Sequence, residues 1–168
     1  LITNFQNYVT KFSNKFNCEI KGLDKPMQTA TNNSGLSIIN FGIGSANAAT
    51  IMDLLIARQP KGVLFLGKCG GLKESTELGH FILPTAAIRG EGTGKDYMPL
   101  EVPALPSFKL HKFVSSKIID HGFEYRTGVI YTTNRRMWEW DVEFKNYLKK
   151  IGAIGIDMET ATIFIVGY

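Results

Sequence analysis

The order of apolar and polar positions along the chain predicts that helices and strands alternate. In residues 1–17 the apolar side chains recur every three or four positions, the pattern of an amphipathic helix lying on a sheet. These positions are Phe5, Val9, Phe12 and Phe16. Two strand-like runs follow at 27–31 and 36–43, and the four turn-forming residues between them predict a hairpin. The second run is almost wholly apolar, which is typical of a central strand.

A strand, a helix and a further strand are predicted next. The glycine turn 42–45 leads from the second strand into a helix over 46–58, with Ser45 available as its N-cap. Residues 62–66 form another buried strand. The helix between the two strands makes them a parallel pair in a βαβ unit.

The rest of the chain repeats this alternation after an irregular loop. Residues 90–107 hold three glycines and three prolines, and a loop this long is typical of a functional segment or an interface. The predicted elements are a strand at 81–88, a helix at 110–121 ending before Gly122, a strand at 125–132, a helix at 141–151, a strand at 153–156 and a helix from Glu159 onward. The pattern predicts an α/β fold in one domain, 1–168.

Composition narrows the class without naming an activity. A chain of 168 residues with 44% hydrophobic and 20% charged residues is globular rather than disordered. The net charge of +4 comes without a dense cluster of lysine and arginine, so nucleic acid is not an expected partner. Apolar runs are far shorter than the ~20 residues that cross a bilayer, and no membrane is expected. Cys18 and Cys69 lie far apart, which favours a reducing cytoplasm over disulfides or zinc.

Two glycine-rich turns are the first candidates for ligand binding. Residues 42–45 and 67–71 each follow a buried strand, so we expect them to be neighbours at the carboxyl edge of the sheet. Free backbone N–H groups and a helix N-terminus favour an anion, and Lys68 adds a positive charge. Neither turn has the spacing of a dinucleotide-binding or P-loop motif. The alternative is that the glycines only permit tight turns.

Arginine and tryptophan gather in a second candidate segment, 132–140. Arg135 and Arg136 offer planar forks that suit a phosphate, and Trp138 and Trp140 offer faces that suit a flat heterocycle. A nucleotide would use both residue types. The alternative is a surface arginine pair above two partly buried tryptophans.

Two carboxylates follow the last predicted strand. Asp157 and Glu159 flank Met158, and a carboxylate held at a strand end can accept two hydrogen bonds from a vicinal diol such as that of ribose. The alternative is that the acidic residues cap and stabilise the helix that begins here.

Together these segments resemble the nucleoside phosphorylase and nucleosidase superfamily. The matching motifs are Gly42-x-Gly44, residues 67–72 and residues 157–162. Within the superfamily the stretches 83–93, 101–106 and 131–136 closely resemble the branch whose substrate is AMP. The resemblance runs from Phe5 to the last residue. It implies a three-layer fold with a mixed, twisted sheet flanked by helices, and assembly into homo-oligomers, hexamers in this branch, with active sites at subunit contacts.

The resemblance also implies roles for single residues. Met158 underlies the sugar, and Glu159 binds the sugar hydroxyls as the catalytic group. Asp157 stands where relatives carry a glutamate, so its shorter side chain has less reach. The three pocket-lining positions that match are Gly44, Cys69 and Gly70.

Two departures from the superfamily pattern sharpen the expected reaction. Phosphorylases hold the attacking phosphate with an Arg-x-Gly-Ser stretch, whereas this chain reads Phe-Leu-Gly-Lys at 65–68, which favours water as the nucleophile. Relatives place an aromatic residue near Arg136 against the purine, and here Trp138 is expected to take that role. The 5′-phosphate is then expected to meet Arg89 and one of Arg135 and Arg136, with Lys68 nearby.

The expected reaction is hydrolysis of the N-glycosidic bond of AMP to adenine and ribose 5-phosphate, through an oxocarbenium-like sugar. The alternatives are a purine nucleoside phosphorylase and a nucleotide-binding module without catalysis. No metal or other cofactor is expected. In the superfamily the general acid is an aspartate on a strand after the helix that begins near Glu159, so we expect this chain to be truncated before it. The 168 residues alone are therefore expected to be inactive or unfolded.

Overall fold

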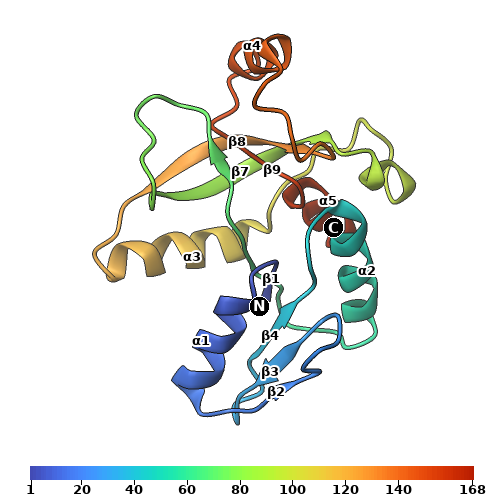
Figure 1. Cartoon of the computed structure of the whole chain (residues 1–168), viewed down its shortest axis with the longest axis vertical. Coiled ribbons are helices and arrows are strands. Elements are labelled where there is room, and N and C mark those ends of the chain that lie inside the picture. The colour runs from blue at the N-terminus through green and yellow to red at the C-terminus, as the bar shows by residue number, and fades with distance from the viewer.

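The computed structural model describes residues 1–168, and its strands form two sheets flanked by helices (Figure 1). The helices are α1 (Gln6–Phe16), α2 (Ser45–Ile56), α3 (Phe108–Asp120), α4 (Val142–Lys150) and α5 (Thr160–Val166), with a 3-10 turn η1 (Thr93–Asp96). The strands are β1 (Ile2–Thr3), β2 (Ile20–Lys21), β3 (Thr29–Thr31), β4 (Ser37–Asn40), β5 (Phe65–Leu66), β6 (Gly70–Gly71), β7 (Phe81–Gly90), β8 (Tyr125–Thr133) and β9 (Gly155–Asp157). The predicted α/β class is confirmed, and its mixed strands lie in two sheets rather than one.

The first sheet has the order β2-β3-β4-β1-β5. The predicted hairpin is confirmed as the antiparallel pair β3 and β4, and the side chain of Asn32 closes its turn by accepting the backbone N–H groups of Ser34 and Leu36. The predicted βαβ unit is correct in direction but not in neighbours, because β1 lies between β4 and β5 and runs parallel to both. Ile2 and Thr3 are therefore buried strand residues rather than the start of the first helix. A strand of two residues leaves no periodic signal in the sequence.

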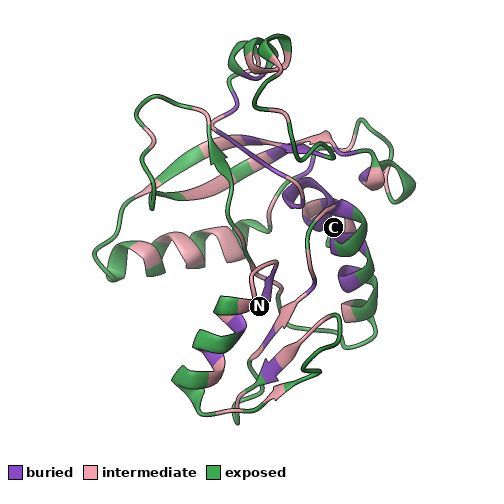
Figure 2. Cartoon of the chain, in the orientation of Figure 1, coloured by how far each residue is buried: buried purple, intermediate pink, exposed green.

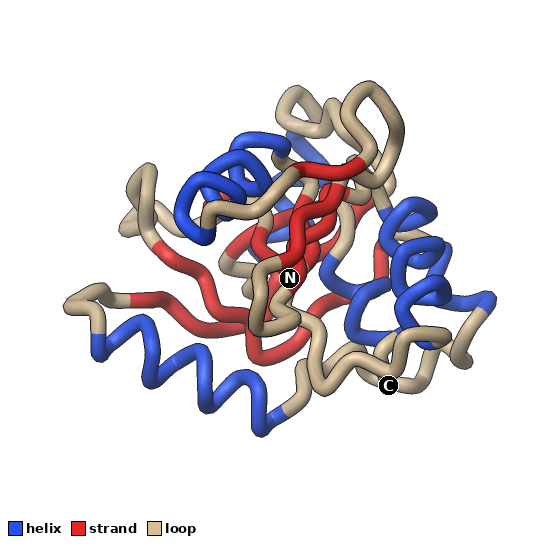
Figure 3. The backbone as a smooth tube through the Cα atoms, turned by 90° about the horizontal axis from the view of Figure 1, so that it is seen from below, coloured by secondary structure: helices blue, strands red, loops and turns tan.

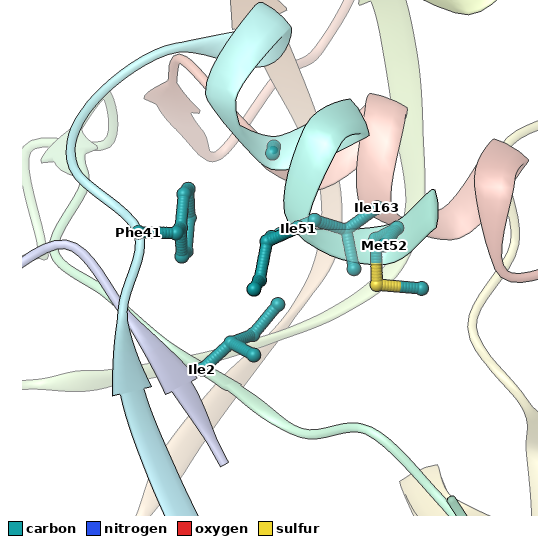
Figure 4. Close-up of a cluster of buried hydrophobic side chains, with 6 residues drawn as sticks. Ile2, Phe41, Ile51, Met52 and Ile163 are labelled. Carbon is teal, nitrogen blue, oxygen red and sulfur yellow. The ribbon is translucent and has the colours of Figure 1, made fainter. Parts of the chain in front are cut away.

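Helices cover both faces of the first sheet (Figure 3). Val9 and Phe12 of α1 pack on one face with Ala30 and Ile38. The next residue along β4, Ile39, packs with the cluster on the opposite face, where α2 lies. Figure 4 shows that cluster, with Phe41 and Ile2 of the sheet region facing Ile51 and Met52 of α2. Alternation along β4 thus places one isoleucine in each core.

The second sheet has the order β6-β9-β8-β7, with β7, β8 and β9 parallel and β6 antiparallel to β9. The chain passes from the first sheet to the second between Leu66 and Gly70. The segment 67–71 is consequently not a simple turn, because Gly70 and Gly71 form β6 and pair with Ile156 and Gly155.

Helix α5 joins the two cores. Its Ile163 belongs to the cluster under α2, whereas Ala161 and Ile165 pack with Ala87 and Ile130 of the second sheet. Figure 2 shows the buried residues concentrated on α5, α2 and the inner strands. Helix α3 buries none of its residues. No helix is both long enough and apolar enough to span a membrane.

Candidate active site

Three parallel strands of the first sheet end at one edge and bring the candidate residues together. β4 leads into the Gly42–Gly44 turn, β1 is followed by Asn4, and β5 is followed by Gly67 and Lys68. Ligands bind in α/β proteins at such carboxyl edges. The two glycine segments thus lie at the same edge of the sheet, as predicted, with β1 and Asn4 between them.

Glu159 is the N-cap residue of α5 and approaches this edge from the second sheet. Its Oε1 accepts the N–H of Gly44 at 2.7 Å, and its Oε2 accepts the N–H of Met158 at 3.2 Å. Only 2% of Glu159 is exposed. The two backbone donors hold its carboxylate in one orientation.

The start of α2 is bonded to the same segment. Gly44, with a φ of 97°, occupies the N-cap position of the helix, a conformation that favours glycine. The expected N-cap Ser45 instead donates its hydroxyl to the carbonyl of Met158 at 2.6 Å. The hydrogen bonds of Gly44 and Ser45 thus join the start of α2 to Met158 and Glu159, the residues just before α5.

Burial sets the protonation behaviour of Glu159. Desolvation raises its pKa above the ordinary value, and the negative charge of Asp157 adds to that direction. The hydrogen bonds from Gly44 and Met158 act in the opposite direction, since they stabilise the charged form. Glu159 is therefore a carboxylate whose charge depends on its donors.

Asp157 makes a different set of contacts. Its Oδ1 accepts the hydroxyl of Thr132 at 2.7 Å, and its Oδ2 accepts the N–H groups of Glu159 at 3.3 Å and Thr160 at 2.8 Å, as well as the Thr160 hydroxyl. Burial raises the pKa of this carboxyl too. The structure thus places Asp157 as the residue that caps α5 and ties it to β8, with its acceptors turned to protein donors.

A cavity of about 380 Å³ opens beside this edge. Its size falls within the range of small-molecule sites. Gly44 and Met158, two of the predicted substrate-binding residues, line it. The other lining residues are Ile43, Ser45, Ala46, Asn47, Glu91, Thr93 and Asn134.

The residues expected around the base lie next to β9. Gly70 pairs with Ile156, and a Cβ on Gly70 would come within 3.5 Å of the Trp138 ring, so the indole lies directly over this glycine. Trp138 is partly buried, whereas 84% of Trp140 is exposed. Cys69 precedes Gly70, and burial, with a contribution from Asp157, raises the pKa of its thiol to about 11. The thiol of Cys69 is therefore neutral, which disfavours a role as a nucleophile.

The basic residues expected around a phosphate do not all point to one place. Arg89 donates to the carbonyls of Met98 at 2.8 Å and Val102 at 2.9 Å, and also to that of Pro99, so it clasps the proline-rich loop. This contact occupies most of a guanidinium expected to meet a phosphate. The Lys68 ammonium lies 4.4 Å from the centre of the Phe5 ring.

The two arginines after Asn134 differ in how they are held. Arg135 forms an ion pair with Asp141 at 2.9 Å and lies over the Phe144 ring. Arg136 is 70% exposed, and its contact with Glu139 is loose, at 3.6 Å. Arg136 is consequently the more available of the two for an anionic group.

Three residues at the site were missed by sequence reasoning. Asn4 was hidden because β1 was not predicted. Glu91 is 4% exposed and accepts the N–H of Gly94 and the hydroxyl of Thr162. The available signal in the sequence was an acidic residue directly after a long, largely apolar strand. Asn134 stood beside the arginines that drew attention. No group of three or more histidine, cysteine, aspartate or glutamate side chains is arranged to hold a metal ion.

Comparisons with known proteins place the chain in one family. The chain belongs to the Phosphorylase superfamily, which it matches over residues 2–168. Within that family it is similar to the crystal structure of AMP nucleosidase from Bacteroides thetaiotaomicron VPI-5482, with 55% identity and a TM-score of 0.96, over 99% of this chain and 72% of that one.

Curated relatives point to the same family with more than one activity. AMP nucleosidase of Escherichia coli K12 is 32% identical over 143 residues, which are 80% of this chain and 30% of that protein. Guanosine phosphorylase of Halorubrum lacusprofundi is 29% identical over 140 residues, 83% of this chain and 58% of that protein. The chain thus spans less than two thirds of the length of these relatives. Cleavage of N-glycosidic bonds is the chemistry that this homology supports.

Proposed function

We propose that the complete protein hydrolyses the N-glycosidic bond of AMP, giving adenine and ribose 5-phosphate. The observation that carries the proposal is the buried carboxylate of Glu159, bonded to the N–H of Gly44 at 2.7 Å beside a cavity lined by Gly44 and Met158. The likeness of the whole chain to the Bacteroides AMP nucleosidase supports AMP as the substrate.

The geometry suits a reaction in which positive charge develops on the sugar. As the bond to the purine breaks, the sugar becomes oxocarbenium-like, and a fixed negative charge beside it stabilises that state more than the ground state. Glu159 supplies this charge without having to reorient, since its donors already hold it. Protonation of the departing purine needs a general acid, a role that the family resemblance gives to an aspartate.

Water is the proposed nucleophile because Phe65 and Lys68 stand where phosphorylases of the family carry the arginine and serine that hold the phosphate. The test measures adenine release from AMP after inorganic phosphate has been removed and again after it is added back. We expect equal rates and ribose 5-phosphate as the sugar product. A rate that depends on phosphate, with ribose 1,5-bisphosphate as product, would instead establish the phosphorylase alternative, which the guanosine phosphorylase relative keeps in view.

The 5′-phosphate is proposed to bind Arg136, with Arg135 beside it. Arg136→Ala is expected to raise the KM for AMP about tenfold, the equivalent of one charge-assisted hydrogen bond, and to leave the KM for adenosine nearly unchanged. Arg126→Ala, at an exposed arginine that donates to the carbonyl of Ser75, is the matched control. Equal effects of Arg136→Ala on both substrates would remove the phosphate assignment.

The purine is proposed to stack on Trp138. Trp138→Ala is expected to raise the KM for AMP about tenfold, because a base on an aromatic face gains on the order of 1–3 kcal/mol. Trp140→Ala removes an indole that is 84% exposed and is expected to leave the KM unchanged. If the two variants have the same kinetics, Trp138 does not hold the base.

We also propose that the protein works in the cytoplasm as a homo-oligomer, a hexamer as the family resemblance implies. Light scattering on the complete protein measures the number of subunits. Binding of AMP by calorimetry without any release of adenine would favour the remaining alternative, a nucleotide-binding module without catalysis.

A further inference from the structure

The segment between β8 and α4 carries three of the proposed binding residues but contains no helix or strand of its own. Arg135, Arg136 and Trp138 all lie in residues 134–141. The indole of Trp138 lies against Gly70 of β6 on one side. It also contacts the ring of Phe144 on α4, with 6.3 Å between the ring centroids and an angle of 74° between the planes. The place of the proposed base-binding ring thus depends on a residue outside its own segment.

Phe144 is itself held by several neighbours. Its ring lies 5.5 Å from that of Tyr131 on β8 and 6.3 Å from that of Tyr147, one turn further along α4, measured between centroids. The guanidinium carbon of Arg135 lies 4.9 Å from the centre of the Phe144 ring. Because β8 is an inner strand of the second sheet, the contact with Tyr131 anchors Phe144 to that sheet.

Asp141 ties the start of α4 to the same segment. Its Oδ1 accepts the N–H of Phe144 at 2.8 Å, and its Oδ2 accepts a hydrogen bond from Arg135 at 2.9 Å. Its own N–H donates to the carbonyl of Trp138 at 3.0 Å. The backbones of Trp138 and Phe144 are therefore joined through Asp141, in addition to the contact between their rings.

The angle between the two rings leaves room for a stacked base. A nearly perpendicular pair is a favourable aromatic arrangement, and it covers at most one face of the indole. A stacked purine needs one face. Trp138 is only partly buried, so part of its ring stays accessible. Phe144 can thus hold the indole without occupying the surface that a base would use.

We propose that Phe144 is a positioning residue for Trp138, whose ring holds the indole against Gly70 in the orientation that accepts the purine. This inference rests on the proposed function, which assigns the purine to Trp138. Phe144 acts through the indole. Stacking is present in the bound substrate and in the transition state alike, so its loss raises KM and leaves kcat nearly unchanged.

The test is a double-mutant cycle on the KM for AMP in the complete protein. Phe144→Leu keeps an apolar side chain and removes the ring, and it is expected to raise KM about threefold to tenfold, the range for an aromatic pair, with kcat nearly unchanged. In a Trp138→Ala background the same substitution is expected to leave KM as it is, because no indole remains to be positioned. Two effects that multiply independently would show that Phe144 does not act through Trp138.

Adenosine separates Trp138 from Arg135, the other proposed binding residue that Phe144 contacts. AMP and adenosine both carry the purine, whereas only AMP carries the 5′-phosphate. Phe144→Leu is expected to raise the KM for both by the same factor. A rise confined to AMP would mean that Phe144 acts through Arg135 and would overturn the inference.

Tyr147→Leu is the matched control on the same helix. Tyr147 contacts the rings of Tyr131 and Phe144 but not that of Trp138. Its replacement is expected to lower the melting temperature and to leave KM unchanged. If Phe144→Leu also lowers only the melting temperature, Phe144 has a structural role and the inference is wrong. Should Phe144→Leu fail to fold, Phe144→Met, with a flexible apolar side chain, takes its place in the cycle.

Failure of the proposed function has a different signature. A wild-type protein that binds AMP and releases no adenine would overturn the proposed hydrolysis. The dissociation constant for AMP, measured by calorimetry, then replaces KM in the same cycle and still supports or excludes Phe144. If Trp138→Ala leaves the affinity for AMP unchanged, the purine does not stack on Trp138, and the proposed binding mode fails together with the role of Phe144.

Discussion

Asp157 and Glu159 lie two residues apart and are both buried, yet their surroundings give them different roles. Asp157 accepts bonds from Thr132 and Thr160 and is turned into the protein. Glu159 accepts bonds from Gly44 and Met158 beside the cavity. Burial raises the pKa of both carboxyls, but only Glu159 accepts hydrogen bonds from Gly44 and Met158, two residues that line the cavity. The positions of their hydrogen-bond donors therefore make Asp157 a helix cap and Glu159 a candidate catalytic group.

Replacing Glu159 by glutamine tests its charge with little change in shape. Gln keeps an oxygen for the N–H of Gly44 but carries no negative charge, so kcat is expected to fall by roughly 10²- to 10³-fold, the range for losing a preorganised electrostatic contact. Steady-state adenine release measures this. A loss below about threefold would exclude Glu159 as the group that stabilises the cationic sugar.

The same variant has a predicted effect on stability with a definite sign. The folded-state pKa of Glu159 is raised above its ordinary 4.5, so the protonated side chain favours folding, and this contribution is lost as pH rises through the raised pKa. Glu159→Gln cannot ionise. Its free energy of unfolding relative to wild type is therefore expected to increase from pH 4 toward neutrality, as measured by urea denaturation. A difference independent of pH would contradict the raised pKa.

Single residues were predictable from the sequence where a motif surrounded them. Met158, Glu159 and Gly44 were proposed because their neighbours match a family pattern, and the structure brings the three together. Asn4 and Glu91 were not, because Asn4 follows a strand of two residues and Glu91 bonds Thr162, which lies far away along the chain. Arg89 shows the reverse case, since its sequence context suggested a phosphate and its guanidinium clasps loop carbonyls.

At the level of elements, length decides what the sequence can predict. The helices α1, α3 and α4 have nine or more residues and were placed within a few positions, and the N-caps Ser107 and Asp141 mark two of their starts. Strands of two residues, such as β1 and β6, carry no periodicity of their own. They form because longer neighbours offer them hydrogen-bonding edges, a long-range effect that local pattern does not contain.

The start of α5 makes a prediction at this scale. Asp157→Ala removes the acceptor for the hydroxyls of Thr132 and Thr160 and for two backbone N–H groups, leaving buried donors without partners. The expected loss is about 2–4 kcal/mol in the free energy of unfolding. Urea denaturation monitored by circular dichroism provides the measurement.

An ordinary N-cap supplies the comparison. Ser107 caps the exposed helix α3 by accepting the N–H of Leu110, and Ser107→Ala is expected to cost about 1 kcal/mol. If Asp157→Ala costs no more than Ser107→Ala, Asp157 is only a cap and does not tie α5 to β8.

At the scale of the whole molecule, the candidate site depends on both sheets, because α5 packs against each of them. It packs Ile163 into the core under α2 and Ile165 into the core of the second sheet, and Glu159 stands at its first turn. Any loosening between the two cores therefore moves Glu159 relative to Gly44. The fold class was predictable from alternation, but this arrangement was not, because it depends on how the two sheets meet.

A polypeptide of these 168 residues alone is expected to release adenine from AMP at no measurable rate. Helix α3 buries none of its residues, and Phe108, Phe113 and Ile119 are 82%, 58% and 60% exposed. Large apolar side chains left exposed in this way favour association. Because the site needs both cores in register, we expect the short polypeptide to bind the dye ANS and to melt without a sharp transition. The complete protein, assayed in parallel, is the control, and adenine release by the 168 residues at its full rate would contradict the prediction.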